Sequence, residues 1–300
     1  MKDVIVIVGP TGVGKTKLSI ELAKYFNTEI INGDSVQIYK ELNIGSAKVS
    51  EEEMQGIRHH LLDFKNIEED YTVYDYQTDL RSKIDEFNVK GLVPLVAGGT
   101  GLYLKAALYD YKFEKEDNNS FNKYEEYSNE ELYELLKEKD EKEALKLHPN
   151  NRKRVVRVLN VINNIGASKT SLLESQKHEP IYNVKFIGLT LPRELLYERI
   201  DKRVDVMISN GLIEETKNLF KKYGDKDYKS LQAIGYKELF AHYRGEISYE
   251  EAIELIKKKS RNYAKRQYTW FNNQFDVKWF DVDLDNFDKT IKSVIDYLRW

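Results

Sequence analysis

Short runs of apolar residues alternate with amphipathic segments through the first third of the chain. Residues 3–8 form a β-branched run typical of a buried strand, and apolar residues recur at helical spacing over 15–26. A second short strand is expected at 30–31, followed by a helix over 72–90 and a third strand over 91–97. Strands and helices that alternate in this way predict a parallel sheet covered by helices on both faces.

The rest of the chain follows a mainly helical pattern. Helical spacing over 151–164 precedes a strand predicted over 184–189. Helices are expected to dominate from 192 to 274, and a short strand near 277–280 and a helix over 286–299 follow them. The pattern therefore predicts an α/β protein with a helix-rich carboxyl-terminal part.

A change of composition at about residue 110 interrupts this pattern. Residues 110–147 are acidic, polar and rich in helix-forming residues, unlike the β-branched segments before them. We therefore expect a helical insertion at 110–147 within a core that is made of residues 1–109 and 148–300.

Composition narrows the class of protein. The 300 residues include no cysteine, which excludes disulfides, thiolate metal sites and cysteine nucleophiles. No apolar run approaches the roughly 18 residues of a membrane helix, and the first residues do not resemble a signal peptide, so we expect a cytoplasmic protein without membrane contact. The net charge of −3 argues mildly against nucleic-acid binding. Basic residues gather in 152–157 and 257–266, however, and such local patches can contact phosphates.

A phosphate-binding motif follows the first predicted strand. Residues 9–16, GPTGVGKT, match G-x-x-x-x-G-K-[ST] without a gap, directly before a predicted helix. Glycines let backbone N–H groups turn toward phosphate oxygens, the helix amino end favours an anion, and the lysine adds a cation. The alternative, a glycine-rich turn with a chance Lys-Thr pair, does not explain this context. The expected phosphate-binding residues are Gly9, Thr11, Gly12, Gly14, Lys15 and Thr16, and the Thr16 hydroxyl can hold Mg²⁺.

The motif alone does not predict nucleotide hydrolysis. An ordinary P-loop NTPase needs an Asp at the end of a neighbouring apolar strand to hold its metal. The best such strand here continues as LVAGGT over 95–100, without a carboxylate, and no Asn-Lys-x-Asp guanine motif occurs. These absences weaken the ATPase and GTPase interpretations and favour a transferase that binds another phosphorylated substrate.

Asp34 follows the second predicted strand, and the carboxyl ends of parallel strands face the ligand crevice. A carboxylate there can take a proton from a nucleophile or hold a metal through water. An Asp at such a turn can equally be a helix or turn cap, and the residues alone leave both interpretations open. Gln37 can form paired hydrogen bonds with an adenine edge, although a loop Gln is more often only solvated.

Two basic stretches are candidates for contacts with nucleic acid. Lys153, Arg154 and Arg157 share one face of the helix predicted over 151–164, where a solvated surface helix is the simpler interpretation. Lys265 and Arg266 lie in a stretch with interleaved aromatic residues, which either stack on unpaired bases or belong to the core.

Several motifs occur in a fixed order along nearly the whole chain. The set resembles the bacterial tRNA dimethylallyltransferases, also called isopentenyl-tRNA transferases. The motifs are GPTGVGKT at 9–16, DSVQIY at 34–39, GSAK at 45–48, HHLLD at 59–63, GGTGLY at 98–103, NNRKRVVR at 150–157, Arg203 with Met207 and GLIEE at 211–215, IGYKE at 234–238, and KRQYTW at 265–270.

The resemblance implies a fold and a reaction. The family has a P-loop kinase-like core with a helical insertion that helps to hold tRNA. It moves a dimethylallyl group from dimethylallyl diphosphate to N6 of adenosine 37, beside the anticodon of the tRNA, with the help of Mg²⁺. A monomer that binds the anticodon stem-loop is therefore expected.

The resemblance also implies roles for residues. Asp34 looks like the general base for the adenine amine, Thr100 like a contact of that base and of the departing bridging oxygen, and Arg203 like a diphosphate ligand. The residues expected to contact tRNA are Asp34, Ser35, Val36, Gln37, Lys123, Lys153, Arg154, Arg157, Lys265, Arg266 and Gln267.

Three alternatives remain at this point. An adenylate isopentenyltransferase, which uses the same donor on free adenine nucleotides, would need neither the insertion nor the cationic helices. A small-molecule kinase is consistent with the phosphate-binding motif but not with the missing metal-binding Asp. A non-catalytic RNA-binding protein would keep its function without the Asp34 carboxylate.

Overall fold

The structure is a computed structural model. It describes residues 1–113, 124–165, 168, 170, 179–224 and 226–299. The chain forms two compact units, of which the first comprises Met1–Leu108 with Pro180–Trp300 and the second Tyr109–Glu179.

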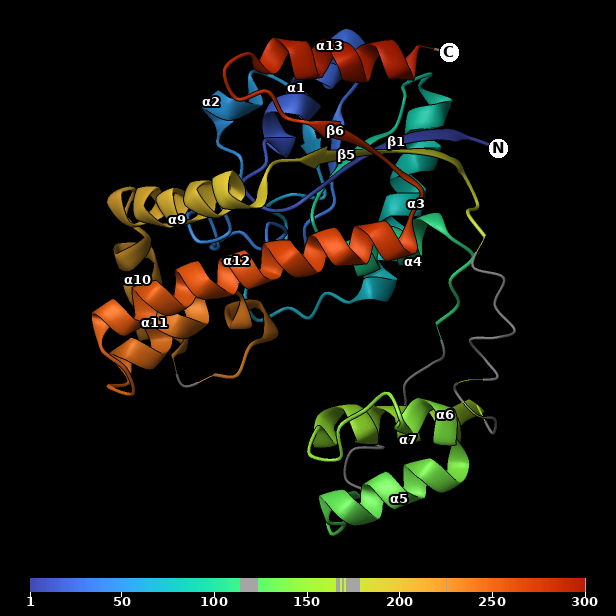
Figure 1. The fold of residues 1–300 in the computed structure, drawn as a ribbon, viewed down its shortest axis with the longest axis vertical. Coiled ribbons are helices and arrows are strands. Elements are labelled where there is room, and N and C mark those ends of the chain that lie inside the picture. Colours follow the sequence, from blue (N-terminus) through green and yellow to red (C-terminus); the bar gives the residue numbers. More distant parts are fainter. Residues whose placement is uncertain (114–123, 166–167, 169, 171–178, 225, 300) are drawn as a thin grey trace. The chain divides into compact units, whose positions relative to one another are not determined.

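The first unit is built on a six-stranded sheet in which every neighbouring pair of strands is parallel. The order of strands is β3-β2-β4-β1-β5-β6, so β1 lies between β4 and β5. Figure 1 shows β1, β5 and β6 side by side. The strands are β1 (Asp3–Val8), β2 (Ile30–Asn32), β3 (His59–His60), β4 (Leu95–Ala97), β5 (Asn183–Thr190) and β6 (Val277–Asp281). The predicted α/β class with a parallel sheet is confirmed.

Helices fill the connections between these strands. Figure 1 shows α1 and α13 on one side of β1, β5 and β6, and α12 on the other side. The helices of this unit are α1 (Lys15–Tyr25), α2 (Glu51–Met54), α3 (Val73–Val89), α4 (Gly101–Leu108), α9 (Arg193–Ser209), α10 (Leu212–Tyr223), α11 (Tyr236–Tyr243), α12 (Tyr249–Gln274) and α13 (Phe287–Leu298), with a 3-10 turn at Lys229–Gln232. In the described part of the chain, no helix is long and apolar enough to span a membrane.

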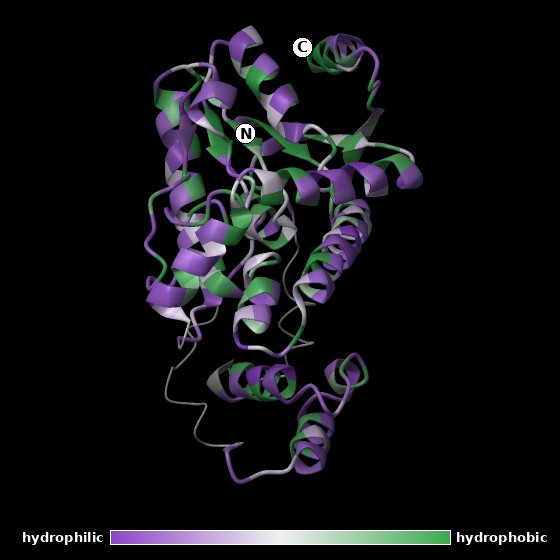
Figure 2. Cartoon of the chain, turned by 90° about the vertical axis from the view of Figure 1, so that its left-hand side faces the viewer, coloured by the Kyte–Doolittle hydropathy of each residue, from purple (hydrophilic) through white to green (hydrophobic). Residues whose placement is uncertain are grey.

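The strands lie in the apolar interior of the unit, and the hydrophilic residues lie mainly on the helices and loops around them (Figure 2). Ile5 and Ile7 of β1 are fully buried in the main hydrophobic cluster, together with Leu18 and Leu22 of α1. The β-branched side chains of Ile5 and Ile7 suit a strand that is covered on both faces. Burial of β1 therefore fixes the place at which the glycine-rich turn after Val8 begins.

Two strands differ from the prediction. The strand expected over 91–97 begins only at Leu95, because Gly91 has a positive φ of 69° and ends the preceding helix in a turn. The two-residue strand β3 was not predicted, since His59 and His60 show neither apolar alternation nor the length of a typical strand.

The second unit contains α5 (Asn129–Lys139), α6 (Glu141–Ala144) and α7 (Arg152–Ile165). Leu132 and Leu136 of α5 are buried in one cluster with Val155 and Leu159 of α7. The prediction had placed α7 in the core, which was expected to resume at residue 148. The apolar face of α7 instead packs within the second unit, so this unit runs to Glu179 rather than to 147.

Two glycine-containing turns touch in the first unit. A Cβ atom on Gly98 would lie 2.1 Å from the carbonyl carbon of Gly33, and one on Gly33 would lie 3.3 Å from the Gly98 Cα atom. The Gly33 N–H donates to the Ala97 carbonyl (2.8 Å), and the Thr100 N–H donates to the Gly33 carbonyl (3.1 Å). The turns that follow β2 and β4 are therefore joined backbone to backbone.

Gly98→Ala is expected to lower the free energy of unfolding by about 3 kcal/mol or more, because the added methyl group would meet backbone atoms rather than a flexible side chain. Urea denaturation followed by circular dichroism measures the change. A variant within about 0.5 kcal/mol of the wild type would show that the two turns can separate without loss of structure.

Candidate functional site

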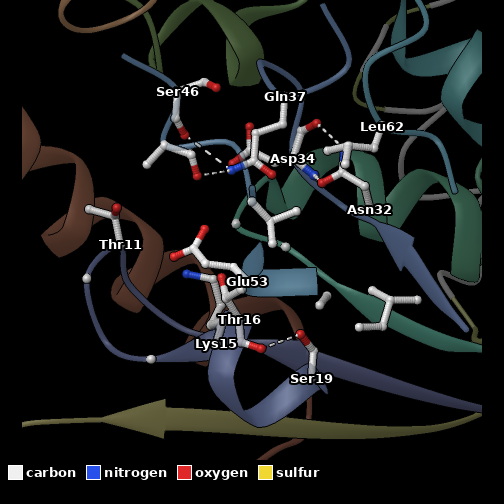
Figure 3. Close-up of a pocket in the computed structure, with 18 of the residues that line it drawn as sticks. Thr11, Lys15, Thr16, Ser19, Asn32, Asp34, Gln37, Ser46, Glu53 and Leu62 are labelled. Atoms are coloured by element: carbon white, nitrogen blue, oxygen red, sulfur yellow. Dashed lines mark hydrogen bonds between the residues drawn. The ribbon is translucent and has the colours of Figure 1, made fainter. Parts of the chain in front are cut away.

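A cavity of about 320 Å³ opens where β1, β2 and β4 end. This is the position at which open parallel sheets bind their ligands. Figure 3 shows Lys15 and Thr16 on one side of the cavity and Asp34 and Gln37 on the other. Nine of the predicted site residues line it: Thr11, Gly12, Gly14, Lys15, Thr16, Asp34, Gln37, Arg203 and Gln267.

The glycine-rich turn after β1 has the backbone shape that a phosphate site requires. Gly12 and Gly14 have φ values of 81° and 111°, which side chains with a Cβ atom rarely adopt. Gly9 is buried, and a Cβ atom there would lie 2.7 Å from the Leu189 carbonyl oxygen. The turn leads directly into α1, whose first N–H groups favour an anion. The motif at 9–16 thus forms a cradle on one side of the cavity.

Lys15 supplies the cation of this cradle. Its ammonium group donates to the carbonyl oxygens of Gly9 and Pro10, both at 2.9 Å. Burial and the nearby charge of Arg203 lower the pKa of Lys15 to about 8, although the charge of Asp34 acts in the opposite direction. The charged form is disfavoured in this surrounding, so a bound anion would stabilise it.

Two arginines of α9 reach the same turn. The Arg203 guanidinium donates to the Thr11 hydroxyl (2.7 Å), and the Arg199 Nε–H donates to the Gly12 carbonyl (3.1 Å). Burial lowers the pKa of Arg203, while the charges of Asp34 and Glu53 raise it. Sequence reasoning missed Arg199, although its spacing of four residues from Arg203 places both on one face of a helix.

Asp34 lies on the opposite side of the cavity, in a turn that is held by its neighbours. Its Oδ1 atom accepts the Val36 N–H (2.9 Å), and its own N–H donates to the Asn32 side chain (3.1 Å). Asn32 is buried and also donates to the carbonyls of Asp34 (3.0 Å) and Leu61 (2.9 Å). The carboxylate is thus oriented by a turn that leaves it at the cavity wall.

Thr100 lies next to this turn. Its hydroxyl accepts the Ser35 N–H (3.0 Å) and donates to the Ser35 hydroxyl (3.2 Å). The adjacent Gly99 lines the cavity, and a Cβ atom on it would lie 3.8 Å from Asp34 Oδ2. Thr100 therefore ties the turn after β4 to the turn that carries Asp34.

The loop after Gln37 is clamped by a residue that sequence reasoning did not assign. The Glu215 carboxylate accepts the N–H groups of Asn43 (3.1 Å), Ile44 (2.8 Å) and Gly45 (3.1 Å), and the Tyr236 hydroxyl donates to it as well (2.8 Å). Further along this loop, the carbonyls of residues 46 and 47 accept the Gln37 amide N–H groups at 3.2 and 3.0 Å. Glu215 thus helps to fix the side chain of Gln37.

Gln267, a predicted tRNA contact, lines the cavity from α12. It is only 5% exposed, because its side chain lies between two backbone turns. Its carbonyl oxygen accepts the Thr11 N–H (2.9 Å), and its amide group donates to the Gly99 carbonyl (3.0 Å). Tyr263, one turn earlier on α12, also lines the cavity, and burial and the charge of Asp34 raise its pKa to about 12.

The remaining predicted RNA contacts lie at three kinds of place. Ser35 and Val36 are half-buried beside Asp34. Lys123 lies outside the described residues. The others are exposed cations, Lys265 and Arg266 on α12 in the first unit and Lys153, Arg154 and Arg157 on α7 in the second.

The residues of the cavity fit a divalent metal ion that is also bound by phosphate oxygens. The exposed Thr16 lines the cavity near the amino end of α1. Hydroxyl and phosphate oxygens are ligands that Mg²⁺ prefers, and the ion usually keeps several waters. Among the described residues, no group of three His, Cys, Asp or Glu side chains could hold a metal by itself. Thr16 therefore fits as one ligand beside phosphate oxygens and water.

Known proteins resemble this chain along most of its length. A family model described as IPP transferase matches residues 37–274. The tRNA dimethylallyltransferase of Anoxybacillus flavithermus is 49% identical over 301 residues, which are 99% of this chain and 96% of that protein. The solved tRNA delta(2)-isopentenylpyrophosphate transferase of Staphylococcus epidermidis has a TM-score of 0.73 at 40% identity, with 100% of both chains covered. A solved eukaryotic dimethylallyltransferase acting on tRNA has a TM-score of 0.87 at 31% identity, covering 98% of this chain and 78% of that one.

The lowered pKa of Lys15 predicts a pH dependence of anion binding. The ammonium form is the one expected to bind a diphosphate, and this form is lost as the pH rises through about 8. Affinity for a saturated alkyl diphosphate should therefore be constant between about pH 7 and pH 8, where the ligand is fully ionised, and fall by up to tenfold for each pH unit above 8. Isothermal titration calorimetry measures this, with proton uptake on binding in the same range.

The matched control for this titration is Lys15→Arg, which keeps its charge throughout the range. Its affinity should not fall above pH 8. The same fall in both proteins would assign the titration to another group.

Proposed function

The chain belongs to the IPP transferase family, and we propose that it transfers a dimethylallyl group from dimethylallyl diphosphate to N6 of adenosine 37 in tRNA, releasing diphosphate. One observation carries the proposal. A single cavity has a phosphate cradle with Lys15 on one side and the Asp34 carboxylate on the other. This arrangement suits a reaction in which a diphosphate leaves one side of a carbon atom. An amine, which loses its proton to the carboxylate, attacks the other side.

The cradle would stabilise the leaving group. Negative charge grows on the diphosphate as the allylic C–O bond breaks, so cations and N–H groups that touch it stabilise the transition state more than the ground state. Lys15, Arg203 and the amino end of α1 surround this place. A magnesium ion held by Thr16 would supply further positive charge to the diphosphate when bound.

Asp34 would act as the general base. The adenine amine is a poor nucleophile because its lone pair is delocalised into the ring. Removal of its proton as the C–N bond forms typically accelerates such a step by about 10²–10⁴-fold. The hydrogen bond from the Val36 N–H holds Asp34 Oδ1, which orients the carboxylate for this role. The adenine base and the bridging oxygen of dimethylallyl diphosphate would also lie near Thr100, whose hydroxyl donates to the Ser35 hydroxyl.

Delivery of the adenosine requires a grip on the anticodon stem-loop. A base that is stacked in a loop must be extruded into the pocket, which costs a few kcal/mol. Contacts of Lys265 and Arg266 with RNA phosphates would offset this cost, as would the exposed cations of α7, Lys153, Arg154 and Arg157. Through the cations of α7 the second unit would help to bind tRNA. We expect the protein to work as a monomer in the cytoplasm.

The test is transfer of radiolabel from dimethylallyl diphosphate in the presence of Mg²⁺, with unmodified tRNA and free AMP offered side by side. Label in tRNA alone is expected. Label in AMP would assign the protein to adenylate isopentenyltransferase activity instead. Label in neither, beside an active control enzyme, would contradict the proposed transfer.

Asp34→Asn tests the base in the same assay. The amide keeps the shape of the side chain and can still accept the Val36 N–H, but it cannot take a proton. The single-turnover rate is expected to fall by about 10²–10⁴-fold, while tRNA binding measured by filter retention stays within about threefold of the wild type. A fall of less than about threefold would exclude Asp34 as the base.

A further inference from the structure

Gln267 joins two turns that are far apart in the sequence. Its side chain accepts the N–H of Thr11 and donates to the carbonyl of Gly99, which are both backbone groups, and it also interacts with the Tyr263 hydroxyl. Thr11 lies in the phosphate cradle, and Gly99 lies in the turn that is tied to Asp34 through Ser35 and Gly33. Gln267 thus spans the cavity's two sides with a single side chain.

The surroundings of this bridge allow little movement. A Cβ atom on Gly99 would lie 2.3 Å from the Gln267 amide nitrogen, and one on Gly101 would lie 2.2 Å from the Trp270 ring. Both glycines therefore let α12 approach the turn after β4. On the other side, Arg203 holds the Thr11 side chain while Gln267 holds its N–H. Thr11 is thus fixed by two elements, α9 and α12.

We infer that Gln267 is a positioning residue that sets the distance between the diphosphate cradle and the turn that carries the base. This inference rests on the proposed function. Displacement at the allylic carbon needs the amine about 3–3.5 Å from that carbon while the diphosphate stays in the cradle. A shift of about 1 Å between the two sides can cost about 10²-fold in rate. Gln267 lines the cavity, and in this positioning role it acts through the backbone of both turns.

The two bonds explain why a glutamine is needed. One end of the side chain must accept a hydrogen bond and the other must donate one, and a carboxamide offers both. Methionine has a similar length but forms neither bond. An ionised glutamate accepts at both ends and would repel the Gly99 carbonyl, whereas a protonated glutamate again has one acceptor and one donor.

Gln267→Met tests the positioning role. We expect kcat for transfer to tRNA to fall by about 10–100-fold, while KM for dimethylallyl diphosphate stays within about threefold, because the cradle itself remains. Gln274→Met is the matched control, since Gln274 lies on the same helix and bonds to Lys105 rather than to either turn. This control should keep the wild-type kcat. Wild-type kcat in Gln267→Met would overturn the inference.

Gln267→Glu separates hydrogen bonding from space filling. Burial and the Gly99 carbonyl should raise the pKa of the introduced carboxyl group, so it becomes protonated as the pH falls. Activity relative to the wild type at each pH should then rise by about fivefold or more between pH 8.5 and pH 6, as both bonds re-form. Gln267→Met should show no such rise. A Glu variant that follows the Met variant at every pH would overturn the inference.

The wild-type protein in the same assay distinguishes the two claims. A wild type that transfers no label would contradict the proposed function, and the positioning role would fall with it. An active wild type beside a fully active Gln267→Met would overturn the positioning role alone. If Gln267→Met does not fold, as judged by its thermal melting curve, the pH profile of Gln267→Glu decides.

Discussion

The contact between Gly33 and Gly98 is the constraint on which the site depends. With no room for even a methyl group, the turns after β2 and β4 meet through their backbones. Hydrogen bonds between β4 and β1 then place the phosphate cradle beside them. Strand pairing therefore places the Asp34 carboxylate and the Lys15 ammonium group at one cavity. Among the hydrogen bonds of the described residues, none joins these two side chains directly. The chemistry of the site follows from the sheet.

Electrostatics makes the same cavity a receptor for an anion. Lys15 and Arg203 lie close together, and burial disfavours the charged form of each. Asp34 and Glu53, which also line the cavity, compensate for only part of the positive charge of Lys15, Arg199 and Arg203. A diphosphate would relieve the repulsion between Lys15 and Arg203 and satisfy the N–H groups of the cradle at once. The protein thus holds in advance the charges that a departing diphosphate needs, which avoids reorganisation during the reaction.

The sequence predicted those parts of the site that follow from local rules. The cradle at 9–16 is one contiguous motif between a strand and a helix, and the position of Asp34 follows from the rule on strand ends. The bridge made by Gln267 depends on a pairing across more than 160 residues, so neither its burial nor its partners could be derived from spacing. The same holds for Glu215, whose loop partners are three backbone N–H groups that leave no signal in the sequence. The sequence prediction ended the second unit at 147 instead of Glu179. The apolar face of α7 shows the same pattern whether it packs in the first unit or in the second, so the pattern alone could not assign α7 to a unit.

The clamp of Glu215 on the loop 43–45 has a consequence for how this part of the protein can vary. Its three loop partners are N–H groups, which every residue except proline provides, so exchanges at 43 and 44 would leave the clamp intact. Position 45 is different, because a Cβ atom there would lie 2.6 Å from the Tyr236 ring. The clamp thus fixes the backbone of the loop without reading the side chains at 43 and 44, and a designer who wishes to move this backbone has to change Glu215 on α10, far from the loop in sequence.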